Sequence, residues 1–140
     1  MFGSLIVREA IDPHKNLFDF DLKDHVIILN EWTQIPFETI YGPFLHDALY
    51  NTVTSILING KGQLKNSNSL VPLENFFVQK GLRYRFRLIL NGIQHCPMEF
   101  SIDEHNLTVI ASDGNPIEPY EVQSIFITSG RIDQKIKSSH

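Results

Sequence analysis

The chain has 140 residues, 42% of them hydrophobic and 20% charged, with a formal net charge of −4 at pH 7. A single globular domain of this length can bury a core without disulfides or metals, and ten Phe provide apolar side chains for it. The acidic balance gives no reason to expect a nucleic-acid partner, because phosphate binding requires clustered Lys and Arg, and no apolar run approaches the ~18 residues of a membrane-spanning helix.

Taken along the chain, seven segments have the composition or the alternating pattern of β-strands. They cover residues 25–30, 54–58, 75–79, 82–90, 98–102, 107–112 and 122–128. Turn signals separate several of them: Asn59-Gly60, Lys80-Gly81, Asp113-Gly114 and, as a tight hairpin turn, residues 103–106. Short strands joined by tight turns predict an all-β fold, a β-sandwich. The stretch from Ile35 to Val53 is long for a sandwich loop and is a candidate wall of a cleft.

Three arginines, Arg83, Arg85 and Arg87, lie on one face of the strand predicted over residues 82–90, opposite an apolar face. Such a stripe could bind an anion. It could instead pair with acidic residues on neighbouring strands or on a neighbouring domain. Pairing with acidic residues is favoured over anion binding, because arginines at alternate positions of a strand more often form ion pairs within the protein.

The segment His95-Cys96-Pro97-Met98 contains three residue types of a blue-copper site, which needs two His, a Cys thiolate and a weak axial ligand such as Met. These residues are crowded into one turn and the start of a strand, where alternating side-chain directions would send them apart. A small buried thiol at Cys96 is therefore favoured over a copper site. The chain also has no His-x-His pair and no nucleophile beside a base in sequence. The sequence predicts neither metal ligands nor catalytic residues.

Glu31 is the carboxylate with the most informative position. It follows an apolar strand and precedes Trp32, at a strand end that would open towards the long stretch after Ile35. A carboxylate beside an aromatic ring at a cleft mouth could hydrogen-bond to a phenol or an aniline, or accept its proton. The alternative is a solvent-exposed Glu that ends a strand.

Two features bear on the compartment. Asn106-Leu107-Thr108 is an N-glycosylation sequon that follows a turn, so Asn106 is a candidate acceptor and secretion is favoured. The first residues have neither the basic nor the apolar region of a signal peptide. If the protein is secreted, its signal is expected elsewhere.

Three blocks stand in fixed order along the chain: Ile56-Leu57-Ile58-Asn59-Gly60-Lys61-Gly62, Gly81-Leu82-Arg83-Tyr84-Arg85-Phe86-Arg87-Leu88-Ile89, and Phe100-Ser101-Ile102-Asp103-Glu104-His105-Asn106-Leu107-Thr108-Val109-Ile110-Ala111-Ser112-Asp113-Gly114. Together they resemble the middle domain of laccase-type multicopper oxidases. The resemblance extends over roughly residues 1–131 and is closest to animal, especially arthropod, laccase-like oxidases. It implies a cupredoxin-like Greek-key β-sandwich.

The resemblance also implies a domain organisation. Residues 1–9 resemble the last strand of the family's first domain, residues 10–134 correspond to the middle domain, and residues 135–140 form a polar tail. The family's closing strand is expected to be missing, which would leave the sandwich incomplete at its C-terminal strand and make the chain a fragment. An open sheet edge of this kind favours pairing with another chain.

In this family, a mononuclear copper in the third domain takes electrons from a phenolic substrate, and a trinuclear cluster between the first and third domains reduces dioxygen to water. The middle domain bridges the other two and supplies part of the substrate pocket. The resemblance therefore implies copper in the full-length protein and none bound by this chain, which would be inactive alone and secreted. It also implies the first and third domains and a phenolic small molecule as partners.

In similar fungal laccases, a carboxylate just before the Trp contacts the substrate. Glu31 stands at this place, with Asn30 and Trp32 as supporting residues. Thr33 and Gln34 follow, where those laccases often carry a His. The alternative function is a non-enzymatic cupredoxin-like binding module that recognises a protein or a small phenol through the same cleft.

Overall fold

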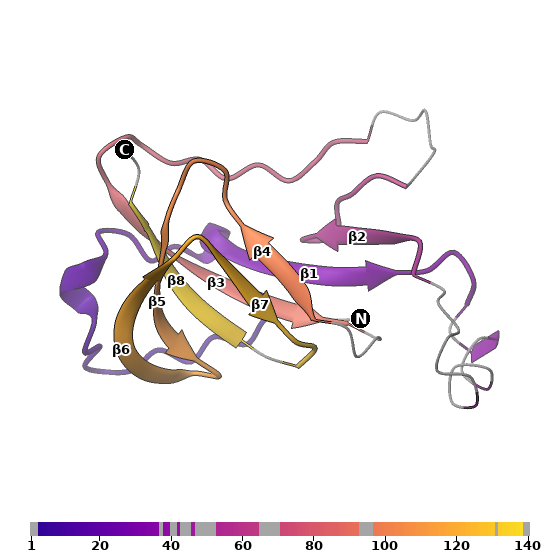
Figure 1. Cartoon of the computed structure of the whole chain (residues 1–140), viewed down its shortest axis with the longest axis horizontal. Coiled ribbons are helices and arrows are strands. Elements are labelled where there is room, and N and C mark those ends of the chain that lie inside the picture. Colours follow the sequence, from indigo (N-terminus) through magenta and orange to yellow (C-terminus); the bar gives the residue numbers. More distant parts are fainter. Residues whose placement is uncertain are drawn as a thin grey trace.

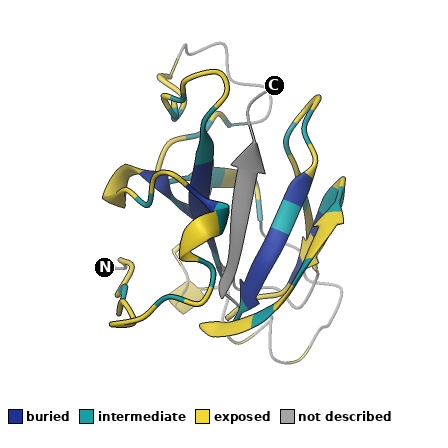
Figure 2. Ribbon diagram, turned by 90° about the vertical axis from the view of Figure 1, so that its left-hand side faces the viewer, coloured by how far each residue is buried: buried dark blue, intermediate teal, exposed yellow. Residues whose placement is uncertain are grey.

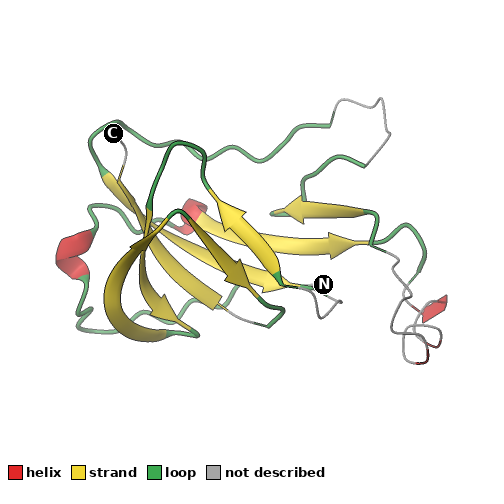
Figure 3. Cartoon of the chain, viewed as in Figure 1, coloured by secondary structure: helices red, strands yellow, loops and turns green. Residues whose placement is uncertain are grey.

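The computed structural model describes residues 3–36, 38–39, 42, 46, 53–64, 71–92 and 97–130, together with the backbone of residues 132–138. The described part of the chain contains eight β-strands and two short 3-10 turns (Figures 1 and 3). The strands are β1 (Val26–Trp32), β2 (Ser55–Ile58), β3 (Arg83–Asn91), β4 (Met98–Ser101), β5 (Leu107–Ser112), β6 (Asn115–Val122), β7 (Ser124–Ile127) and β8 (Ile132–Ser138). The turns η1 (Lys15–Leu17) and η2 (Lys23–His25) precede β1. The predicted all-β fold is confirmed.

The strands form two sheets that share one core (Figure 2). Six strands in the order β2-β1-β3-β8-β5-β6 make the larger sheet, and β4 pairs with β7 in the smaller one. Strands β1 and β3 are parallel, whereas the other neighbours are antiparallel. Both sheets contribute to the core, for example through Leu88 of β3, Val109 of β5 and Ile127 of β7.

Strand β3 lies inside the larger sheet, between β1 and β8, and is buried on both faces. Its apolar side chains, from Tyr84 to Leu90 at alternate positions, belong to the core. On the other face, Arg85 and Arg87 are only 8% and 4% exposed. The predicted division of this strand into an apolar face and an arginine face is therefore confirmed, but Arg85 and Arg87 on the arginine face are also removed from water.

One predicted strand is not a strand. Residues 75–79 have the alternating burial that the sequence suggests, with Phe76 and Val78 packed on the core and Phe77 89% exposed. However, the structure gives residues 71–79 no strand pairing. An alternation of apolar and polar residues indicates which side chains are buried. It does not indicate whether another strand is available for backbone hydrogen bonding. We call residues 71–79 the strap.

Strand β6 is absent from the sequence prediction, which placed no strand over residues 115–121. Pro116 and Pro119 lack the N–H that a ladder needs, so proline lowers the expectation of a strand. Because β6 is the edge strand of the larger sheet, prolines are tolerated there. The turn predicted at residues 103–106 is present, with the His105 N–H donating to the Ile102 carbonyl at 3.1 Å. It does not close a hairpin, since β4 pairs with β7 and β5 pairs with β6 and β8.

Residues 135–138 were expected to belong to a polar tail, and the structure corrects this expectation. The backbone of residues 132–138 forms β8, which pairs with both β3 and β5. A strand therefore fills the position at which the sequence suggested a missing one. Its composition, with only two apolar residues among seven, carries no strand signal, and the pairing comes from the two neighbouring strands.

The predicted turn at Asn59-Gly60 ties the start of β1 to the end of β2. Asn59 adopts a positive φ of 52°, which Asn tolerates better than most residues. Its Oδ1 accepts from the Ile28 N–H at 2.8 Å, and its Nδ2 donates to the Val26 carbonyl at 2.9 Å. The side chain thus acts as a short extension of the backbone ladder beside β1.

We expect Asn59→Ala to lower the free energy of unfolding by about 2–3 kcal/mol. The substitution removes two hydrogen bonds to β1, and Ala, unlike Asn, has no polar side chain that offsets the cost of a positive φ. Asn59→Gly is the matched control, since it keeps the backbone freedom and loses only the side-chain bonds; it should cost less. Urea unfolding monitored by circular dichroism measures both. Equal stability of wild type and Asn59→Ala would contradict this account of the turn.

Candidate functional site

The predicted site residues lie at the end of β1, but not on one face. Glu31 continues the face of Ile27 and Leu29, which lines the core, because alternate residues of a strand point to the same side. Asn30 and Trp32 point to the opposite face. Asn30 is 3% exposed and Trp32 is 52% exposed. The structure therefore separates Glu31 from the two residues that were predicted to support it.

The Glu31 carboxylate lies where β3 ends. A Cβ added at Gly92 would be 3.1 Å from Glu31 Oε2, so the carboxylate occupies space that a glycine leaves open. The Ser129 hydroxyl donates to the Gly92 carbonyl at 2.7 Å, and the Gly130 N–H donates to the Leu90 carbonyl at 3.1 Å. These bonds bring the segment after β7 to the same end of the sandwich. A carboxylate placed here can accept a hydrogen bond from a hydroxyl group.

No pattern in the sequence points to Gly92 or Ser129 as neighbours of Glu31. Neither residue belongs to a motif, and they are 37 positions apart in the chain. Gly92 comes next to Glu31 only because β1 and β3 pair in parallel, with Asn30 opposite Asn91. Asn30 itself has an Oδ1 atom that is buried without a hydrogen-bond partner.

Other sequence-derived candidates fall largely outside the described residues. This holds for most of the stretch over 35–53 and for His95 and Cys96. Within the described ranges, no three His, Cys, Asp or Glu side chains gather as a metal-binding group. Asn106, the last residue of the turn at residues 103–106, is exposed, as a glycosylation acceptor must be. The described helices include none long and apolar enough to cross a membrane.

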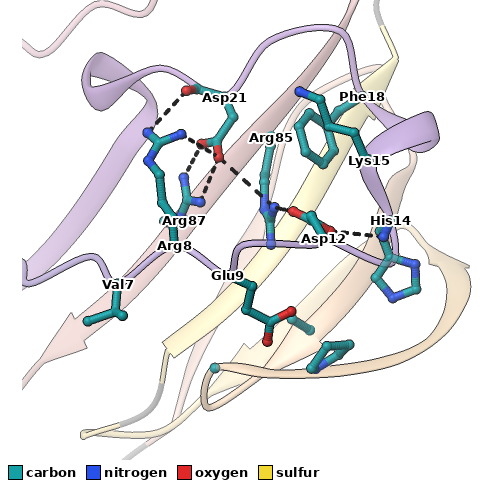
Figure 4. A pocket seen from close by; sticks show the side chains of 13 residues that line it. Val7, Arg8, Glu9, Asp12, His14, Lys15, Phe18, Asp21, Arg85 and Arg87 are labelled. Carbon is teal, nitrogen blue, oxygen red and sulfur yellow. Dashed lines mark hydrogen bonds and ion pairs between the residues drawn. The ribbon is translucent and has the colours of Figure 1, made fainter.

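The arginine face of β3 meets aspartates of the N-terminal segment (Figure 4). Arg87 donates to both oxygens of Asp21, in one case at 2.8 Å, and Arg85 donates to Asp12. Arg8 also reaches Asp21, at 3.0 Å. The acid-pairing interpretation of the arginine stripe is confirmed. The acids come from the segment before β1, however, and not from a neighbouring strand or domain.

These ion pairs border a cavity of about 240 Å³. Phe18 lies beside it with two cations near its ring, Lys15 at 4.9 Å and Arg85 at 5.0 Å from the centroid. Such contacts are favourable for partly desolvated cations. Because the guanidinium groups of Arg85 and Arg87 are already held by carboxylates, the cavity belongs to a network that stabilises the fold. The sequence contains a signal for these ion pairs, because Asp19 and Asp21 stand at alternate positions, as the arginines of β3 do.

The pKa values of the aspartates reflect this pairing. Burial by itself would raise the pKa of Asp21, but the hydrogen bond and the positive charge of Arg87 outweigh it and hold this pKa below its ordinary value. Burial would likewise raise the pKa of Asp12. The hydrogen bond from the His14 N–H and the pairing with Arg85 outweigh burial, so the pKa of Asp12 is also below its ordinary value. Groups whose pKa is depressed on folding contribute stability above their unfolded pKa and lose it as the pH falls through the folded pKa.

With the fold and the arrangement of these residues established, the family can be assigned. The sequence profile of the family described as multicopper oxidase matches residues 23–132. The chain belongs to the multicopper oxidase family.

Individual relatives agree with this assignment. Laccase-1 of Thanatephorus cucumeris is 31% identical over 141 residues, which cover 98% of this chain and 24% of the relative. Laccase-1 of Agaricus bisporus is 36% identical over 126 residues, covering 89% of this chain and 24% of the relative. The crystal structure of the laccase from Botrytis aclada superimposes with a TM-score of 0.69 at 32% identity, over 82% of this chain and 22% of that one. The chain thus spans about a quarter of the length of the curated relatives it matches.

We expect Asp21→Asn to lower the free energy of unfolding by about 3 kcal/mol at pH 7, because it leaves the buried Arg87 without a counter-charge. The same substitution should flatten the loss of stability on acidification below about pH 4, which the ionised Asp21 otherwise contributes. Urea unfolding at a series of pH values measures both effects.

Asp19→Asn is the matched control. Asp19 pairs with Arg83 at 3.1 Å, but both side chains are more than a third exposed, so this pair should contribute much less. An equal loss of stability in Asp19→Asn and Asp21→Asn would show that the buried Asp21–Arg87 pair contributes no more than the exposed Asp19–Arg83 pair.

Proposed function

We propose that this chain is the middle, non-copper-ligating domain of a laccase-like oxidase, which oxidises phenolic substrates and reduces dioxygen to water. In this proposal the chain bridges the first and third cupredoxin domains and contributes part of the substrate pocket. Support comes from the three ordered sequence blocks, from the laccase relatives, and from the quarter of their length that the chain spans. Without the other domains, the chain is inactive.

The observation that carries the bridging role is the exposure of large apolar side chains. Leu5 and Val7 of the N-terminal segment are almost fully exposed, and so is Phe77 of the strap. Phe126 of β7 is also exposed. Large exposed apolar side chains gain free energy when another domain covers them. These residues lie on three different elements, which suits a domain that contacts more than one neighbour.

Copper belongs to the other domains in this proposal. A copper site requires His and Cys ligands in a compact group, and the described residues offer no such group. Glu31 is the proposed substrate contact, because its carboxylate stands at an end of the sandwich and can accept the hydrogen bond of a phenol. Asn30 and Trp32 would support it only from the opposite face of β1.

We also propose that the protein is secreted and that Asn106 is glycosylated. The animal or arthropod subtype stays a prediction, and the laccases compared above are fungal. That the chain is a fragment of the oxidase is likewise part of the proposal.

The copper assignment is tested with the purified chain and one equivalent of Cu(II). We expect no intense blue absorption band and no oxidation of guaiacol, because neither copper centre of a laccase has its ligands here. A stoichiometric blue complex that turns guaiacol over would overturn the proposal. Cys96→Ser is the control, since it would abolish a blue complex formed through this thiol.

The role of Glu31 is tested by guaiacol-induced stabilisation of the chain. Guaiacol should raise the melting temperature of the wild type, and Glu31→Gln should weaken binding about tenfold, because an amide is a poorer acceptor than a carboxylate. Glu99→Gln, on an exposed position of β4, is the matched control and should behave as wild type.

Unchanged stabilisation of Glu31→Gln would exclude this residue as the contact. Stabilisation that depends on Glu31 in a chain encoded by a complete transcript would favour the alternative, a non-enzymatic binding module. Flanking sequence with His-x-His and His-Cys-His motifs would support the oxidase.

A further inference from the structure

His25 is a buried histidine that neither the family assignment nor the proposed site uses. Its side chain is 3% exposed and lies among aromatic rings, with its centroid 5.1 Å from that of Tyr84 and 4.9 Å from that of Phe86. The ring is hydrogen-bonded to the backbone of Phe77 in the strap. Its Nδ1 atom is buried without a partner. The neutral ring tolerates this arrangement, whereas a protonated ring would carry an N–H that has no acceptor.

The strap is held by side chains. The Gln79 N–H donates to the Tyr84 hydroxyl at 2.9 Å, and Phe76 packs edge-on against Phe86 with centroids 5.7 Å apart. Glu74 accepts from Asn59 at 3.3 Å and pairs with Lys61. The structure gives the strap no strand partner. Among the described residues, the hydrogen bond to His25 is one of the polar contacts that hold the strap against the sandwich.

The charges around His25 favour its protonation, but they do not dominate. Burial lowers the pKa of His25, and the bond to Phe77 and the charges of Asp24 and Asp21 counteract it only in part. Asp21 and Glu74 have pKa values below their ordinary range, Asp21 through Arg87 and Glu74 through Lys61 and Asn59. These two acids stay ionised between pH 5 and 8. Of these three groups, His25 is the one whose ordinary pKa lies in that interval.

We propose that His25 is a pH-sensitive latch, which keeps the strap closed while the ring is neutral and lets it open when the ring is protonated. The protonated ring must reach water, and it lies between the strap and β3. Strand β3 is fixed by ladders to β1 and β8, whereas the strap has no ladder, so the strap is the part that yields. Opening gives access to a cavity of about 360 Å³ beneath it, lined by Phe76, Val78, Phe86 and Phe100 among others.

The sign of the effect follows from linkage. His25 in the open state has the ordinary pKa of about 6.5, and the closed state has a lower one. Above this pH, both states are neutral and opening is independent of pH. Below it, the open state binds the proton that the closed state refuses, so the opening constant rises by up to about tenfold per pH unit.

Amide hydrogen exchange of the full chain, corrected for intrinsic rates, tests the latch. The Gln79 amide reports on the strap, and the Leu88 amide reports on β3. Between pH 6.5 and 5.5, we expect the protection of Gln79 to fall by up to about fivefold while that of Leu88 stays constant. In His25→Gln, the protection of Gln79 should no longer depend on pH. His105→Gln, in the turn before β5, is the matched control and should behave as wild type.

Three results would overturn the proposal: protection of Gln79 that does not change with pH in the wild type, an unchanged pH dependence in His25→Gln, or a parallel loss at Gln79 and Leu88, which would indicate global unfolding. If His25→Gln fails to fold, His25→Phe replaces it, because a phenyl ring fills the aromatic surroundings and cannot titrate. None of these measurements involves copper or a phenol, so the latch can fail or hold independently of the proposed function.

Discussion

The ion pairs of Arg85 and Arg87 with Asp12 and Asp21 allow β3 to be buried on both faces. A strand with alternate arginines would normally keep one face in water, since an unpaired buried charge is strongly unfavourable. Here the segment before β1 neutralises that face, so β3 can accept β1 on one side and β8 on the other. The larger sheet and the core against β4 and β7 are built around this central strand.

Composition, turn signals and the alternation of apolar and polar residues were sufficient to predict β1, β2, β3, β4, β5 and β7, because each has a face on the shared core. It failed where pairing depends on distant parts of the chain. Strand β8 has a polar composition and exists because β3 and β5 both offer it a ladder. Residues 75–79 have the right alternation and no ladder at all. Periodicity describes burial, whereas a strand also requires a partner, and one sequence does not reveal the partner.

The candidate site illustrates the same limit of sequence reasoning at the level of single residues. Neighbours in a strand point to opposite faces, so Asn30, Glu31 and Trp32 could not all line one pocket from β1 alone. Glu31 lies on the core face beside Gly92, which the pairing of β1 with β3 brings there. Ser129, from the segment after β7, is hydrogen-bonded to Gly92. The chemistry available to Glu31 is thus set by groups that are remote in sequence.

The apolar side chains most exposed to solvent lie on segments that backbone ladders do not hold. Leu5 and Val7 precede Arg8, whose bond to Asp21 ties this segment down, and Phe77 belongs to the strap. The two attachments respond to different acidity, since the aspartate pairs persist until the pH falls below about 4, whereas the proposed His25 latch opens increasingly as the pH falls below about 6.5. In moderately acidic solution the strap can therefore loosen while the N-terminal segment stays attached. Taken together, the two proposals imply a domain that changes one exposed apolar surface and keeps the other.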